Sequence, residues 1–113
     1  FNLFSQPTDM RKGFNGLSGI VSNTLKDNPR SGEVFIFVNK TRDKIKLLQW
    51  QDNGFVLYYK RLEQGTFELT QYEEMEGSIV LSYTKMAMMV DGLSIKNIAS
   101  RKRFNPVNPT VKG

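Results

Sequence analysis

The feature that most constrains the fold is a β-hairpin pattern in the middle of the chain. Two runs rich in β-branched and aromatic residues, 45–50 and 55–60, flank the pair Asn53-Gly54. Such a pair predicts a two-residue turn, because Asn and Gly both accept positive φ angles. The earlier run Val34–Val38 is short and wholly apolar, which is typical of a central strand. We therefore expect an antiparallel sheet built around this hairpin.

The turn also predicts which residues pair across the hairpin. A turn at Asn53-Gly54 places Asp52 opposite Phe55, Trp50 opposite Leu57 and Leu48 opposite Tyr59. Cross-strand partners point to one face, and we expect the core face, with Trp50 buried against the first helix, to carry Leu48, Trp50, Phe55, Leu57 and Tyr59. The other face is mixed, and we expect part of it to be wet or reserved for a partner. That face carries Ile45, Leu47, Gln49, Gln51, Val56, Tyr58 and Lys60.

Apolar residues spaced three and four apart predict two helices, one before the strands in the sequence and one after them. Thr8 is expected to cap the first helix, and Ser82 the second. Residues 66–69 and 78–81 are expected to be short strands. The predicted fold is α+β, a single domain with an antiparallel sheet, a central Asn-Gly hairpin and two helices packed on one face.

Three glycines lie three residues apart in the first helical segment, at Gly13, Gly16 and Gly19. Each glycine costs up to ~1 kcal/mol against Ala inside a helix. The spacing is not the dinucleotide-binding fingerprint, which must directly follow a strand. We therefore interpret the glycines as a place where another backbone comes close.

The composition argues against most catalytic machinery. The 113 residues include no Cys and no His, so a thiolate nucleophile and the commonest general base and metal ligand are absent. The acidic residues form no paired-carboxylate or metal-binding motif, although a nuclease site built from scattered acids stays a remote alternative. We expect no catalytic residues, no metal, no cofactor and no small-molecule substrate. No segment approaches the ~20 apolar residues of a membrane span, so we expect no membrane partner and a cytoplasmic location.

The charge suggests an anionic partner, with nucleic acid the first candidate. The formal net charge is +5 and the pI is about 9.6. Basic residues interleaved with aromatics can bind nucleic acid through phosphate contacts and stacking. The alternative is that these residues only keep the hairpin and its loops soluble. The candidate nucleic-acid-binding residues are Arg11, Lys12, Arg42, Lys44, Lys46, Lys60, Arg61, Arg101, Lys102 and Arg103.

Two of these candidates are expected in the first turn of the first helix. Positive charge at that position opposes the helix dipole. Arg11 and Lys12 therefore suggest either a buried ion pair or a bound anion, and the ion pair is favoured. At the other end, residues 1–96 are expected to form the folded domain and residues 97–113 a flexible basic tail, because the tail is polar and contains Pro106 and Pro109.

Four blocks of sequence then resemble a known family. The blocks are residues 8–17, residues 35–37 followed by 43–50, residues 52–67 and a closing segment at residues 79–93. Together they are similar to the TnpB-type, "Orf-two-like" accessory proteins of a family of bacterial insertion sequences. The resemblance implies a helper encoded beside a separate transposase, which would be the main partner. The family pattern defines no catalytic residues, so none is transferred to this chain.

We therefore predict a non-catalytic accessory protein of DNA transposition. Its favoured mechanism is binding of nucleic acid or of the transposase complex through a basic surface. The alternative is a protein–protein adaptor that docks the transposase on the mixed sheet face and does not touch DNA.

Overall fold

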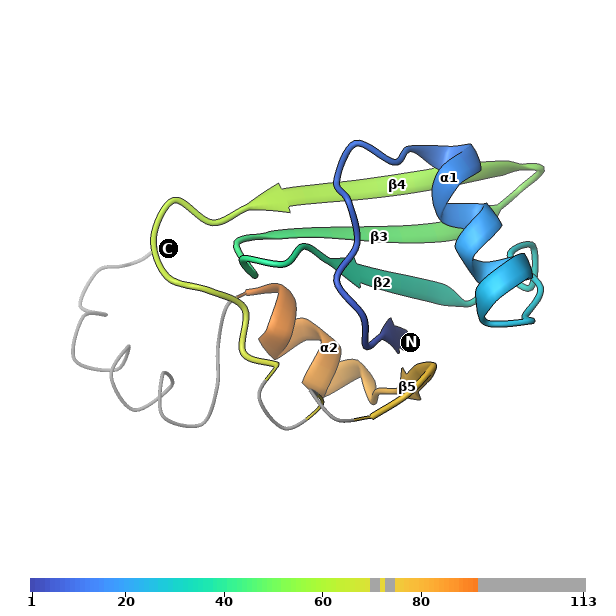
Figure 1. The fold of residues 1–113 in the computed structure, drawn as a ribbon. Helices are drawn as coiled ribbons and strands as arrows, with labels where there is room; N and C mark the ends of the chain where they lie inside the picture. The colour runs from blue at the N-terminus through green and yellow to red at the C-terminus, as the bar shows by residue number, and fades with distance from the viewer. Residues whose placement is uncertain (70–71, 73–74, 92–113) are drawn as a thin grey trace.

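The computed structural model describes residues 1–69, 72 and 75–91, and it has the predicted α+β architecture (Figure 1). A five-stranded mixed sheet has the strand order β4-β3-β2-β1-β5. The elements are β1 (Asn2–Phe4), α1 (Phe14–Gly19), the π-helical segment η1 (Ile20–Thr24), β2 (Val34–Val38), β3 (Lys44–Gln51), β4 (Gly54–Arg61), β5 (Ser78–Val80) and α2 (Tyr83–Val90).

The sheet combines an antiparallel meander with one parallel pair. Strands β2, β3 and β4 follow one another in antiparallel pairs, and β2 is the middle strand, as predicted from its apolar run. The first strand, β1, was not predicted. It pairs parallel with β2 and antiparallel with β5. Three residues are too few to show a strand periodicity, so nothing local in the sequence indicated β1.

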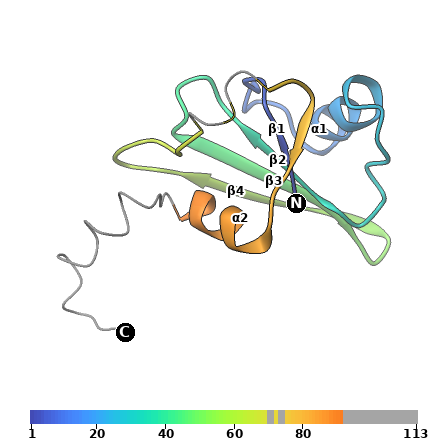
Figure 2. The same cartoon turned by 90° about the horizontal axis from the view of Figure 1, so that it is seen from below.

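The two helices cover opposite faces of the sheet, and the prediction that both lie on one face was wrong (Figure 2). The reason is that β2 is apolar at every position, so both of its faces must be covered. The core under α1 and η1 consists of Leu17, Val21, Phe35, Phe37 and Leu48. The core on the α2 side consists of Leu3, Ile36, Val38, Ile45, Phe67, Tyr72, Leu81 and Met89.

The central hairpin forms, but its turn lies one residue earlier than predicted. Asp52 and Asn53 occupy the turn, with φ angles of 42° and 70°, and Gly54 begins β4 without a positive φ. Trp50 therefore pairs with Phe55, and Leu48 pairs with Leu57. This register keeps the charged Asp52 away from Phe55, which the predicted register would have placed opposite it. Each strand still presents the predicted residues to each face.

Trp50 is half-buried, so its predicted burial against the first helix was wrong. Its ring contacts Phe55 edge-on, with centroids 5.0 Å apart. The Arg30 guanidinium lies 4.9 Å from the centre of the Trp50 ring. Trp50 thus lies near the turn, at the end of the hairpin, where a cation covers it instead of a helix. Tyr59, also predicted to face the core, is 51% exposed.

The first helix begins at Phe14, and Thr8 is not its cap. Thr8 is buried, and its backbone N–H donates to the carbonyl of Val38 at 2.9 Å, which attaches the incoming chain to the sheet. A Cβ added to Gly13 would meet nothing within 4 Å, and the nearest atoms at Gly16 and Gly19 belong to the side chains of Lys12, at 3.0 Å, and Asn23, at 3.9 Å. The prediction that another backbone approaches the helical glycines was therefore wrong.

The second helix agrees with its prediction. The Ser82 side chain accepts a hydrogen bond from the backbone N–H of Lys85, as expected of a cap, and Met89 is buried in the core. Residues 78–80 form the expected strand. Residues 66–69 form no strand, although Phe67 is buried and its N–H donates to the Arg42 carbonyl at 2.7 Å.

Candidate interaction surfaces

The predicted cations do not gather into one patch. The end of the hairpin away from the turn carries three of them on the α1 face, namely Lys44, Lys46 and Arg61. Lys44 pairs directly with Arg61, and Lys46 is two residues further along the same strand and so points to the same face. Arg11 and Lys12 approach the same face from the loop before α1, not from a helical turn. The remaining described candidates lie elsewhere, with Lys60 on the α2 face and Arg42 in the loop between β2 and β3.

Lys46 is an internal residue. Its side chain is on the core face of β3, and the residue is only 6% exposed. The Nζ atom donates to the carbonyls of Met10 and Lys12, both at 2.8 Å, and lies 4.5 Å from the centre of the Tyr59 ring. These contacts hold the loop before α1 against the hairpin. The buried ammonium already has its partners, so Lys46 is not available to a phosphate.

Lys60 makes a similar contact with backbone on the opposite face of the sheet. Its Nζ donates to the carbonyl of Val90 at 2.7 Å. Val90 is the last residue of α2, where carbonyls lack partners within the helix and where the helix dipole favours a positive charge. Lys60 therefore anchors the end of α2 to β4.

Three other candidates lie beside carboxylates. Arg11 binds Asp9 at 2.6 Å, with 92% of the arginine side chain exposed. Hydrogen bonds from the Arg11 side chain and backbone lower the pKa of Asp9 to about 2. The ion pair predicted for Arg11 is thus present, but it is exposed and not buried. Arg61 contacts Glu63 at 2.9 Å in the same exposed manner.

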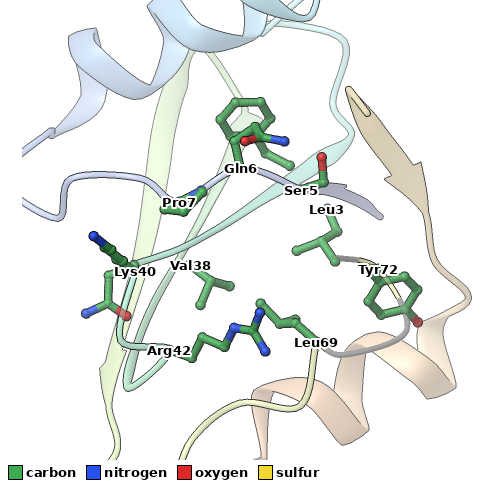
Figure 3. Close-up of a pocket in the computed structure, with 11 residues that line it drawn as sticks. Leu3, Ser5, Gln6, Pro7, Val38, Lys40, Arg42, Leu69 and Tyr72 are labelled. Atoms are coloured by element: carbon green, nitrogen blue, oxygen red, sulfur yellow. The ribbon is translucent and has the colours of Figure 1, made fainter. Parts of the chain in front are cut away.

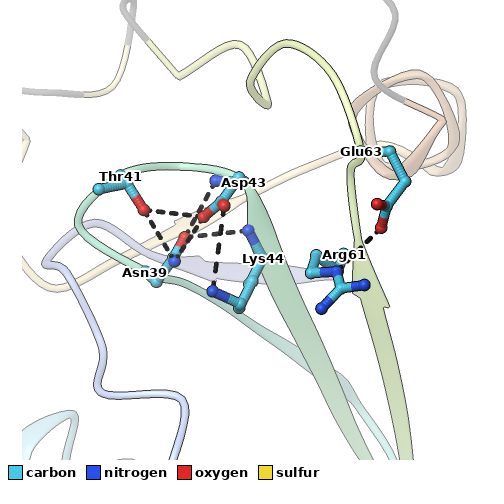
Figure 4. A network of polar contacts seen from close by, with 6 residues as sticks. All are labelled: Asn39, Thr41, Asp43, Lys44, Arg61 and Glu63. Carbon is cyan, nitrogen blue, oxygen red and sulfur yellow. Dashed lines mark hydrogen bonds and ion pairs between the residues drawn. The ribbon is translucent and has the colours of Figure 1, made fainter.

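The third of these pairs belongs to a polar network in the loop between β2 and β3 (Figure 4). Asn39 and Thr41 both donate to Asp43 at 2.7 Å, which lowers the pKa of that carboxyl. Lys44 lies 3.9 Å from the other Asp43 oxygen. The network fixes the loop in one conformation, with Arg42 at a φ of 61°.

That conformation directs Arg42 into a pocket that Lys40 also lines (Figure 3). The pocket has a volume of about 250 Å³ and includes Leu3, Val38, Leu69 and Tyr72 in its lining. Burial raises the pKa of the Tyr72 hydroxyl. Arg42 is thus separated from the basic residues of the hairpin with which it was grouped.

The mixed face of the hairpin is covered only in part. The α2 side buries Ile45 completely, but Val56 is 48% exposed and Tyr58 is 46% exposed. Between them and α2 lies a mainly apolar groove of about 280 Å³. The sequence predicted a wet or partner-binding region on this face, but it did not predict that α2 would form one wall. The groove is lined by Val34, Leu47, Gln49, Val56, Tyr58, Met86 and Val90.

The net positive charge belongs to the C-terminal segment. Five of the sixteen basic residues follow Asp91, whereas all eleven acidic residues lie at or before it. Residues 1–91 therefore carry equal numbers of basic and acidic side chains. The candidates Arg101, Lys102 and Arg103 lie outside the described residues, as does the predicted domain boundary at residue 96.

Residues 1–69, 72 and 75–91 contain no group of three or more acidic, His or Cys side chains that could hold a metal ion. Within the same ranges, no helix is long and apolar enough to cross a membrane.

Comparison with known proteins identifies relatives along most of the chain. The uncharacterized protein y4jC of Sinorhizobium fredii (strain NBRC 101917 / NGR234) is 33% identical over 89 residues, which are 79% of this chain and 74% of that protein. The uncharacterized protein y4hO of the same strain is 33% identical over 86 residues, or 76% and 73% of the two chains. No solved structure matches. The pattern of IS66 Orf2-like proteins matches residues 1–100, so the chain belongs to this insertion-sequence family, which implies an accessory role in transposition.

Proposed function

We propose that the folded domain is a non-catalytic adaptor that docks the transposase of the same element. The observation that carries this proposal is the apolar groove between the hairpin and α2. A groove of this kind accepts apolar side chains of a protein partner, and covering its walls gains about 25 cal/mol for each Å² of apolar surface removed from water. Tyrosine is enriched at protein interfaces, and Tyr58 lines the groove with 46% of its surface exposed.

The charges of the folded domain support the adaptor over a nucleic-acid-binding sheet. Two of the predicted phosphate ligands, Lys46 and Lys60, bind backbone carbonyls of the domain itself. Arg11 and Arg61 each share their charge with a carboxylate. Residues 1–91 have no net formal charge, so long-range attraction of DNA to this part of the chain is weak.

The docking test compares two methionines of α2 that differ in position alone. Met86 lines the groove, whereas Met88 is two residues away on the same helix and is not part of it. Met86→Gln should reduce capture of the transposase about five- to tenfold, because it introduces an amide into an apolar contact. Met88→Gln should leave capture unchanged. Capture should also persist in 1 M salt and after nuclease treatment. Equal capture by both variants, each with an unchanged melting temperature, would contradict the proposal.

The basic residues after Asp91, which carry the net positive charge of the chain, favour a second function. We propose that any direct DNA contact is made by the segment after Asp91, through Arg101, Lys102 and Arg103. If about four to five cations reach phosphates, log K should fall against log[salt] with a slope of about −4. Changing these three residues to Gln should reduce the slope by about 3. The matched change of Arg11 and Lys12 to Gln should alter it by less than 1. No binding of a fluorescent duplex at low salt would leave the adaptor function alone.

The proposal that the protein is not an enzyme has its own test. The purified chain should not cleave DNA in the presence of Mg²⁺ or Mn²⁺. Cleavage that disappears when two or three acidic residues are changed to their amides would contradict the proposal.

A further inference from the structure

Strand β4 lies at one edge of the sheet, and none of the described residues pairs with its outer side. The strand has eight residues and pairs with β3 from Lys44↔Arg61 to Gln51↔Gly54 without interruption. In the described part of the chain, no strand lies beyond it. The opposite edge strand, β5, has only three residues. Long open edges invite pairing with another chain, because their backbone N–H and C=O groups lack partners.

The register shows which backbone groups of β4 point outward. Just beyond the strand, the N–H of Leu62 donates to the carbonyl of Asp43 at 2.7 Å, so residues 43 and 62 form a hydrogen-bonded pair. Hydrogen-bonded pairs alternate along an antiparallel ladder. The even-numbered residues of β4 therefore bond to β3, and Phe55, Leu57 and Tyr59 direct their N–H and C=O groups away from the sheet.

The edge lacks the features that usually prevent pairing. Residues 54–59 contain no charge and no proline, and the regular register excludes a bulge. Val56, Tyr58 and Tyr59 are each about half-exposed, at 48%, 46% and 51%. Apolar side chains on both faces of the strand thus flank an unpaired row of backbone groups.

We propose that two copies of this protein associate through antiparallel pairing of β4 with itself, centred on Leu57. The strand is self-complementary about this residue. Val56 meets Tyr58 of the second copy on one face, and Phe55 meets Tyr59 of the second copy on the other. Aromatic–aromatic and aromatic–β-branched pairs are among the favourable cross-strand combinations. Four exposed or half-exposed side chains of each copy become covered.

The charges at the two ends of the strand select a second copy in the antiparallel direction. Asp52 lies in the turn before β4, and Arg61 lies at its other end. With Leu57 at the centre, Arg61 lies opposite Asn53 and next to Asp52 of the second copy. Parallel pairing would instead bring Arg61 beside Arg61. Since the twofold axis is perpendicular to the sheet, the grooves of the two copies lie side by side on one face.

The register is tested by charge pairs in the full chain. In Val56→Lys/Tyr58→Lys, each introduced lysine faces a lysine of the second copy, and the dissociation constant of the dimer should rise at least tenfold. In Val56→Lys/Tyr58→Glu, each introduced lysine faces a glutamate, and dimerisation should recover to within a few-fold of wild type. Sedimentation velocity over a range of concentrations measures the dissociation constants of both double variants and of the wild type. A wild-type chain that stays monomeric at high concentration, or equal dimerisation by the two double variants, would overturn the proposal.

A cross-link provides a second measurement that does not depend on charge. The chain has no cysteine, so a single introduced thiol reports on one position. The two Leu57 Cα atoms in the proposed dimer are about 5.5 Å apart, within the range of disulfides. Leu57→Cys should give a cross-linked dimer under mild oxidation. The control is Val80→Cys, on the other edge strand and 79% exposed, which should give at least tenfold less. Equal cross-linking would overturn the proposal.

Discussion

The face of the sheet under α1 is closed by packing over its centre, with Tyr59 half-exposed at its edge, whereas the face under α2 has an open groove between its helix and the hairpin. On the first face, Phe35, Phe37 and Leu48 are fully covered by α1 and η1, and Lys46 completes the cover by binding the loop before α1. On the second face, an eight-residue helix covers Ile45 but leaves Val56 and Tyr58 half-exposed. The difference indicates that the first face stabilises the fold and the second face is available to a partner.

The largest expected effect separates these two roles. Leu48 is fully buried under α1, so Leu48→Ala should reduce the free energy of unfolding by about 3 kcal/mol. Tyr58→Ala removes a larger side chain from the groove but should reduce it by less than about 1 kcal/mol, because the ring is half-exposed. Urea denaturation measures the free energy of unfolding of both variants. Similar losses would mean that the groove face also belongs to the stabilising core.

The two internal lysines give a smaller effect of the same kind. Lys46→Met leaves two carbonyls without their charged donor and should reduce the free energy of unfolding by about 2 kcal/mol. Lys60→Met removes a single contact at the end of α2 and should reduce it by about 1 kcal/mol. The measurement is thermal and urea unfolding of the two variants in parallel. An unchanged stability for Lys46→Met would show that this lysine is not structural.

The hairpin turn offers the next comparison, between neighbouring residues. Asn53 has a φ of 70°, which a β-branched residue resists, so Asn53→Val should lower stability by about 1–2 kcal/mol. Gly54 has no positive φ, and a Cβ added there meets no atom within 4 Å. Gly54→Val should therefore change stability by less than about 0.5 kcal/mol. A larger loss of stability in Gly54→Val than in Asn53→Val would instead support the predicted turn at Asn53-Gly54.

The sequence predicted the central strands because their signals are local. The apolar run of β2 and the two runs around residues 52–54 specify strands without knowledge of the rest of the chain. The exact turn was missed, because Asp and Asn can adopt the same left-handed conformation as Asn and Gly. The placement of α2 was missed because it depends on which face of the sheet needs cover, and that is a property of the whole fold.

The candidate site was predicted less well, because charge alone does not show whether a lysine is exposed. Lys46 follows the same alternation as Leu48 and Trp50, so its place on the core face could have been inferred from the sequence. Lys60 could not, since its partner is the end of a helix 30 residues later. The sequence placed Val56 and Tyr58 on the mixed face of the hairpin, where they are half-exposed, but it did not predict the groove wall formed by Met86.

The smallest expected effect concerns the exposed charges at the edge of the α1 face. Hydrogen bonds from Arg11 lower the pKa of Asp9 from 3.8 to about 2, so the folded state binds this proton less readily than the unfolded state. The contribution of the pair to stability is therefore present above about pH 4 and is lost as the pH falls towards 2. NMR titration should find the Asp9 midpoint near 2 in the wild type and higher in Arg11→Gln, but still below 3.8, because the backbone N–H of residue 11 continues to donate to the Asp9 carboxylate. Because the pair is exposed, overall stability at pH 7 should hardly change in this variant. A clear loss at pH 7 would mean that the loop before α1 is held by Arg11 as well as by Lys46, and that the edge of the closed face depends on surface charge.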